Sequence, residues 1–143
     1  MRCRGCRRAP GWAAAPYPRP QPIRTGWATA ELLDYARSTG TADRPGLAVM
    51  AYSPLHQGVF TRDDKSLFNG ADHAGSRERI AVLRAVAAEI GATPNQVALA
   101  WLLGGEVPVI PVFGASSVAQ LDEVLGAADL VLDEETRARL DNA

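Results

Sequence analysis

Two short apolar runs constrain the fold of this chain more than any other feature. The first, GLAVMAY, covers residues 46–52, and the second, VPVIPV, covers residues 107–112. Short apolar runs that end in turns are typical of parallel strands buried on both faces. The sequence between them favours helices, which predicts a right-handed βαβ unit. Because a sheet of only two such strands has open edges and little core, we expect a segment of a larger α/β fold.

Helix start signals surround these two runs. The expected helices cover residues 30–38, 76–90, 94–103, 118–127 and 134–140. Their predicted N-caps are Thr29, Ser76, Thr93, Ser117 and Asp133. At Thr93 and at Ser117, a glutamine three residues later completes a capping-box pattern. Trp101, on the apolar third helix, is expected in the core.

The first 24 residues differ in composition from the rest of the chain. They hold six arginines, no acidic residue and half of the prolines. We expect a disordered, basic leader, more simply a solvated tail than a nucleic-acid binder. Cys3 and Cys6 lie in this leader. They lack the second ligand pair that zinc needs, so two inert, reduced thiols are favoured over a redox pair. No metal site is predicted.

No apolar run approaches the ~18 residues of a membrane span, and the basic N-terminal stretch lacks the apolar core of a signal peptide. We therefore expect a cytoplasmic protein with no membrane partner. Nucleic acid is an improbable partner for the same chain.

Each strand run leads into a polar loop. The first, rich in Gly, Asp, Asn and Ser, covers residues 53–75, and the second begins with FGASS at residues 113–117. Such loops form the ligand-binding edge in parallel-sheet enzymes, and amides at a helix N-terminus favour phosphate. Simpler roles remain open, because Tyr52 could only end a strand and Ser117 could only cap a helix. His56 could line a substrate pocket, although a solvated loop histidine is the simpler interpretation.

Three motifs in this order resemble the C-terminal part of the aldo-keto reductase family. They are AYSPL at 51–55, ATPNQVALAWLL at 92–103 and VIPVFGASSVAQLDEVLGAADL at 109–130. The resemblance runs from about Glu31 to residue 143. It implies the C-terminal βαβα segment of a (β/α)8 TIM barrel, incomplete here, within a partial domain at 25–143. Family members are oxidoreductases that reduce carbonyls with NADPH or oxidise alcohols with NADP.

The resemblance also implies ten cofactor-binding residues at the two strand ends. They are Tyr52 against the nicotinamide ring; Ser53, Leu55 and Gly58 around the pyrophosphate; Gly114, Ala115, Ser116 and Ser117 at the adenosine phosphate; and Gln120 and Glu123 near the adenine and ribose.

The sequence departs from the family pattern at three points. The serine turn has no Lys or Arg for a 2′-phosphate, so NAD is possible beside NADP. Val124 stands where an asparagine often meets the adenine. The family's catalytic Asp, Tyr, Lys and His come from earlier strands, and no catalytic residue can be named here.

These departures lead to a specific expectation. The chain is interpreted as a truncated family member that binds a nicotinamide dinucleotide weakly and is inactive alone. A small carbonyl substrate would bind only if the barrel were completed. The alternative is a non-catalytic nucleotide-binding or assembly module that completes its sheet on a partner chain. Open strand edges also predict self-association.

Overall fold

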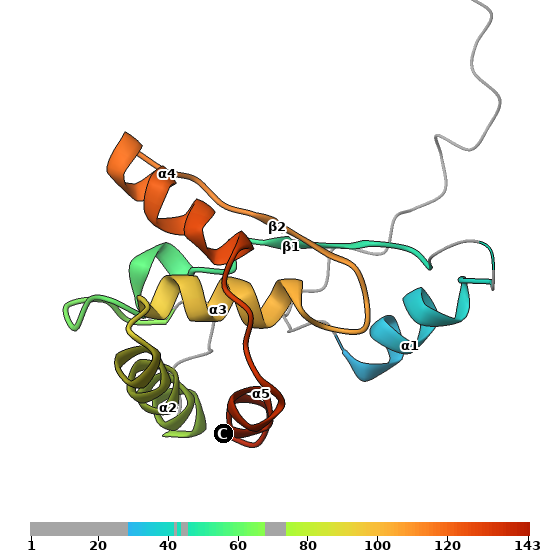
Figure 1. The fold of residues 1–143 in the computed structure, drawn as a ribbon, viewed down its shortest axis with the longest axis horizontal. Helices are drawn as coiled ribbons and strands as arrows, with labels where there is room; N and C mark the ends of the chain where they lie inside the picture. The colour runs from blue at the N-terminus through green and yellow to red at the C-terminus, as the bar shows by residue number, and fades with distance from the viewer. Residues whose placement is uncertain (1–28, 42, 44–45, 68–73) are drawn as a thin grey trace, which may run out of the picture.

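The computed structural model describes residues 29–41, 43, 46–67 and 74–143 (Figure 1). The predicted leader at 1–24, with Cys3 and Cys6, lies outside the described residues. In chain order the elements are α1 (Ala30–Ser38), β1 (Val49–Tyr52), the 3₁₀ turn η2 (His56–Gly58), α2 (Ala74–Ile90), α3 (Pro94–Leu103), β2 (Val109–Val112), α4 (Val118–Leu125), the 3₁₀ turn η3 (Gly126–Ala128) and α5 (Glu134–Asp141).

The two strands pair in parallel, as the sequence predicts. Their register runs from Val49 opposite Val109 to Tyr52 opposite Val112. The amide of Val49 donates to the Pro108 carbonyl, just before the second strand, at 2.8 Å, and the amide of Ser53 donates to the Val112 carbonyl at 2.9 Å. Since amides on a strand alternate in direction, Ala51 also donates toward β2, and its partner Pro111 faces the other way. The proline therefore needs no amide hydrogen at its position in the ladder.

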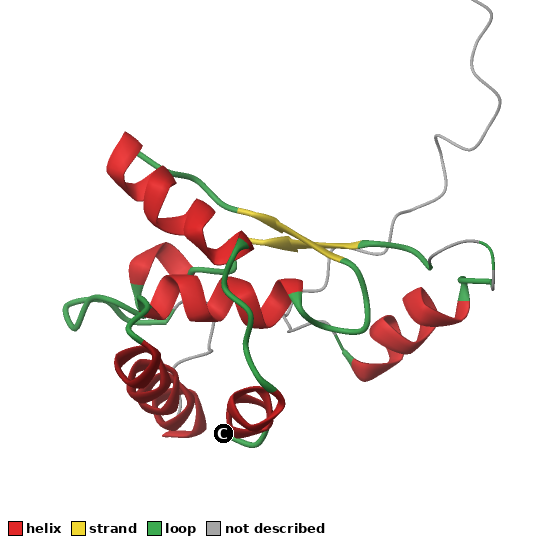
Figure 2. Ribbon diagram, in the orientation of Figure 1, coloured by secondary structure: helices red, strands yellow, loops and turns green. Residues whose placement is uncertain are grey.

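Three of the described helices lie on one side of this small sheet. Helices α2, α3 and α5 all lie on the same side of the strands (Figures 1 and 2). On the sheet, Met50 and Ile110 are register partners and are 68% and 50% exposed. The prediction of strands buried on both faces is therefore wrong for this chain, because no described element covers the second face.

The core lies between helices rather than against the sheet. One cluster joins α2 and α3 and contains Leu83, Val86, Ala87 and Val97. The other joins α3 to α4 and η3 and contains the residues Leu99, Val124 and Ala127. Neither β1 nor β2 contributes a buried residue. The helices thus supply most of the burial that holds the described chain together.

Most predicted helix starts are confirmed. The side chains of Thr29, Thr93 and Asp133 each accept a hydrogen bond from the backbone amide three residues on. The full capping box forms at Thr93, where the Gln96 side chain accepts from the cap amide at 3.0 Å. Ser76 is not a cap, because α2 already begins at Ala74.

Side-chain contacts join the last helix, α5, to both α2 and α3. Arg139 of α5 forms a bidentate pair with Glu89 of α2, with N–O distances of 2.5 and 3.0 Å. Trp101 of α3 donates its indole N–H to the Asp141 carboxylate at 2.7 Å. The expectation of a core tryptophan is wrong, because Trp101 is 36% exposed and its polar edge faces this surface partner.

Candidate functional site

The ends of the two strands meet at one edge of the sheet. Tyr52 and Val112 are paired, and the Ser53 amide donates to the Val112 carbonyl at 2.9 Å. The chain leaves β1 into the loop that contains Ser53, Leu55 and Gly58, and it leaves β2 into residues 113–117. The pairing therefore brings the starts of both predicted cofactor loops together.

The loop after β1 has an unusual backbone. Ser53, His56 and Gln57 have φ angles of 53°, 46° and 58°, and Gly58 has 88°. Left-handed φ values cost a non-glycine residue roughly 1–2 kcal/mol. Strain of this kind gathers at ligand clamps and active sites, where the surrounding structure holds it in place.

Two residues at this strand end have opposite environments. Tyr52 is 87% exposed, so its ring is open to a stacking partner on the helix-free face. Leu55 instead packs against the second core cluster, together with Phe113 from the other loop. Leu55 therefore anchors the loop through its side chain, and any contact with a phosphate falls to its backbone.

The serine turn after β2 is open on its outer side. A Cβ added to Gly114 would meet no heavy atom within 4 Å. Ser117 caps α4 by accepting from the Gln120 amide at 3.2 Å, while the amides of Val118 and Ala119 have no acceptor among the described residues. Free amides at a helix start, with the helix dipole behind them, are suited to an anion.

Ser116 and Gln120 are bonded to each other. The Gln120 side-chain oxygen accepts from the Ser116 amide at 2.8 Å and from its hydroxyl at 2.9 Å. Gln120 therefore leaves the Ser117 amide alone, and only half of the predicted second capping box forms. Both residues are exposed, and a ligand at this turn would compete with these two bonds.

Glu123 is tied to the start of α3. Its carboxylate accepts from the Thr93 hydroxyl at 2.7 Å and from the Asn95 amide group at 3.2 Å. The sequence indicates only a capping role for Thr93 and no role for Asn95. Nothing in the sequence signals a contact between residues 28 or 30 positions apart on different helices.

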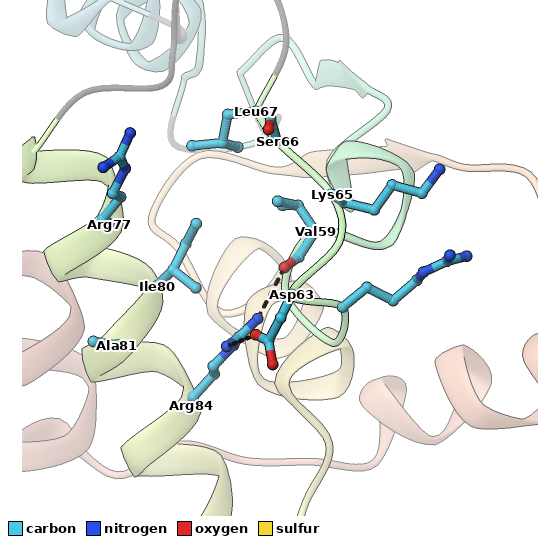
Figure 3. A pocket seen from close by; sticks show the side chains of 10 residues that line it. Val59, Asp63, Lys65, Ser66, Leu67, Arg77, Ile80, Ala81 and Arg84 are labelled. Carbon is cyan, nitrogen blue, oxygen red and sulfur yellow. Dashed lines mark hydrogen bonds and ion pairs between the residues drawn. The ribbon is translucent and has the colours of Figure 1, made fainter.

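Arg84 fixes the far part of the loop after β1. It donates to the carbonyl of Phe60 at 2.8 Å. It also donates to the carbonyl of Val59 at 3.2 Å and to Asp63 at 2.6 Å (Figure 3). This α2 side chain was also missed, because an arginine on a helix gives no sign of the loop that it binds. Its bonds hold the segment that directly follows Gly58.

His56 is packed within the same loop. Its ring meets the Phe60 ring edge-on, with 6.0 Å between centroids, and it is half-buried. Burial lowers the pKa of the His56 imidazole. The interpretation of His56 as a solvated loop histidine therefore holds only in part, because the turn at η2 folds the ring back onto Phe60.

A hollow of about 380 Å³ lies between residues 59–67 and α2 (Figure 3). Arginine and lysine side chains dominate its polar lining. Within it, Arg84 pairs with Asp63, and Arg62 pairs with Asp64 nearby, so part of this positive charge is neutralised. None of the ten predicted cofactor residues lines it, so the candidate site lies at the strand-end loops and not in this hollow.

The described residues contain no group of His, Cys, Asp and Glu that could hold a metal ion. Within the same ranges, no helix has the length and apolar character needed to cross a bilayer.

Comparison with known proteins decides the family. The sequence model of the Aldo/keto reductase family matches residues 27–143. The chain belongs to this family. The N-terminal limit of the match, at residue 27, lies near the predicted start of the resemblance at Glu31.

Similar aldo/keto reductases and related enzymes are much longer than this chain. An uncharacterised oxidoreductase of Mycobacterium bovis is 38% identical over 108 residues, which cover 66% of this chain and 33% of the relative. An aldo-keto reductase of Strobilurus tenacellus is 34% identical, over 66% and 32% of the two chains. Pyridoxine 4-dehydrogenase of Escherichia coli is 52% identical over 56 residues, or 39% and 20%.

The fold agrees with the sequence comparison. The crystal structure of a thermostable aldo-keto reductase in complex with the inhibitor epalrestat matches with a TM-score of 0.56 and 28% identity. The match covers 78% of this chain and 32% of that one. The chain therefore spans about a third of the length of the relatives it matches.

Proposed function

We propose that this chain is the C-terminal βαβα segment of a (β/α)8 barrel, and that its two strand-end loops form part of a nicotinamide-dinucleotide site. The parallel pairing of Tyr52 with Val112 carries the proposal, because it joins both loops at one sheet edge. Active sites of such barrels lie at the carboxyl ends of the strands. NADP is the proposed cofactor, with NAD possible.

The residues at this edge fit such a ligand in chemistry. The exposed Tyr52 ring can stack on an aromatic ring, and the open amides of Val118 and Ala119 can bind a phosphate. The free space beyond Gly114 lets a ligand approach the backbone closely. When bound, the dinucleotide would supply hydride transfer, and this chain's residues would bind and orient it.

The chain by itself supplies only part of a reductase. General acid catalysis requires a proton donor close to the substrate oxygen. The family resemblance assigns that donor to earlier strands, so we propose that a small carbonyl substrate binds only when those strands complete the barrel. Purified chain should not oxidise NADPH in the presence of aldehydes or ketones. Robust turnover would contradict this proposal.

Titration of the chain with NADP and with NAD tests the site. We expect a Kd towards the millimolar range, about −4 kcal/mol, because the other walls of a barrel site are not supplied by this segment. Amide NMR signals of Ser53 and residues 114–119 should shift. The control is Gly114→Val, which has room in the unliganded chain and should block only the ligand. Unchanged binding in this variant would put the ligand elsewhere.

A second candidate function is a non-catalytic assembly module that completes its sheet on a partner chain. The observation in its favour is the open sheet face with Met50 and Ile110. Nucleotide titration separates the two, since an assembly module without a nucleotide site should give no shifts at Ser53 or at the serine turn.

A further inference from the structure

The start of α3 holds α4 through one acidic residue. Glu123 of α4 accepts from Thr93 and Asn95 through its carboxylate, and its backbone carbonyl accepts from the Gln96 side chain at 2.8 Å. Three polar contacts from the N-cap and first turn of α3 thus converge on a residue that we assign to the cofactor site. The arrangement fixes both the backbone and the side chain of Glu123.

The hydrogen bonds to the Glu123 carboxylate are unequally distributed between its two oxygens. Thr93 and Asn95 both donate to Oε1, at 2.7 and 3.2 Å. Within the described part of the chain, no residue donates to Oε2. A carboxylate can accept about four hydrogen bonds, so this group is oriented but not saturated. The residue is also only partly buried. An oriented carboxylate of this kind can still accept bonds from a ligand.

Asn95 holds this position at a cost to the folded chain. It is 8% exposed, and its Oδ1 atom is buried without a donor among the described residues. Flipping the amide would give Oδ1 a neighbour of the wrong kind, the Glu123 carboxylate oxygen. An unsatisfied buried acceptor is destabilising, and it calls for a reason other than stability. The contact of Nδ2 with Glu123 supplies one.

Glu123 lies close to the serine turn along α4. It follows Gln120 by three residues and therefore lies on the same side of the helix. The Gln120 side chain in turn bonds Ser116. Ribose hydroxyls and the exocyclic amine of adenine are hydrogen-bond donors, and a carboxylate oxygen is their natural acceptor.

From these contacts we infer that Thr93 and Asn95 are positioning residues, which orient the Glu123 carboxylate so that Oε2 accepts from the adenosine part of the dinucleotide. This inference rests on the proposed cofactor site. It deepens that site by adding two residues that do not touch the ligand and act only through Glu123.

Binding of two half-cofactors tests the inference. The probes are AMP and nicotinamide mononucleotide, titrated into the whole chain and followed by amide NMR shifts. Asn95→Leu should raise the Kd for AMP roughly three- to tenfold, as expected for loss of one aligned hydrogen bond, and should change that for nicotinamide mononucleotide less than twofold. Thr93→Ser, which keeps the hydroxyl, should retain AMP binding.

The melting temperature provides the readout that separates positioning from a structural role. Asn95→Leu removes the unsatisfied Oδ1, so thermal stability should hold or rise while AMP affinity falls. A purely structural asparagine would instead lower stability and weaken both probes together, which would overturn the inference.

A double-mutant cycle with Glu123→Gln completes the test. If Asn95 acts through the Glu123 carboxylate, Asn95→Leu should have little further effect on AMP in the Glu123→Gln background. An equal loss in both backgrounds would overturn the positioning role and leave the cofactor site standing. Failure of the unsubstituted chain to bind AMP, NADP and NAD would instead overturn the proposed function, and this inference with it.

Discussion

Tyr52 and Val112 are direct partners in the parallel ladder, and beyond them both strands give way to loops. This relationship connects the fold to the candidate site. Parallel strands end at the same edge, so loops separated by about sixty residues in sequence become neighbours. The same pairing leaves one sheet face and both outer edges open within the described chain.

The open face should drive self-association. Met50 and Ile110 are register partners on it, and charged side chains there would oppose burial of this apolar face between molecules. We expect Met50→Lys with Ile110→Lys to shift the chain toward monomer in size-exclusion chromatography with light scattering. Val131→Lys is the control, since Val131 is 89% exposed in the segment before α5. Equal dissociation by both substitutions would point to net charge rather than the sheet.

The sequence predicted the elements well because local chemistry fixes them. The N-caps at Thr29, Thr93 and Asp133 depend on residues three apart, which a reader of the sequence can see. Parallel pairing followed from two apolar runs with helices between them. These parts of the fold needed no knowledge of long-range contacts.

The sequence could not reveal how side chains far apart combine. Arg84 binds the loop around Val59, and Asn95 binds Glu123. The partners in these contacts are 25 and 28 positions apart in the sequence. Strain at Ser53 was equally hidden, because serine carries no preference for a positive φ. The prediction that both strand faces are buried failed for another reason. Apolar composition reports what a strand can bury, and neighbours decide whether it does so.

Attachment of α1 should depend on Gly46. The amide of Leu47 donates to the Ala36 carbonyl at 3.1 Å, and a Cβ on Gly46 would collide with that same carbonyl oxygen. We expect Gly46→Ala to cost roughly 1–3 kcal/mol of unfolding free energy in urea, as overpacking does. In the control Gly105→Ala the new Cβ would have 3.6 Å to its nearest neighbour. Similar losses in both variants would contradict this account.

Docking of α5 should weaken in acid. Hydrogen bonding from Arg139 lowers the pKa of the Glu89 carboxyl from its ordinary 4.5. A lowered folded-state pKa means that this stabilisation is present above pH 4.5 and is lost as the pH falls through the folded value. Glu89→Gln should therefore lower the melting temperature at pH 7 and flatten its decline below pH 4.5. A melting temperature with the same acid dependence in both proteins would rule out this contribution. The pair is exposed, so the effect should be small and should shrink in salt.

Preference between the two dinucleotides should be tunable at Ser116. This residue lies in the serine turn, where the chain offers hydroxyls and no positive charge. Without a cation, the 2′-phosphate of NADP gains little over NAD. Ser116→Arg would add a planar, charged donor, and a charge-assisted hydrogen bond contributes roughly 1.5–3 kcal/mol. We therefore expect NADP affinity to rise by roughly ten- to a hundredfold while NAD affinity stays nearly constant. Leu125→Arg provides the matched control, because it adds the same charge at an exposed position on the other end of α4. Calorimetric titration of both nucleotides at two salt concentrations measures the difference. A gain of equal size for NADP in the Leu125→Arg protein would indicate general charge attraction, and it would remove the 2′-phosphate from the serine turn.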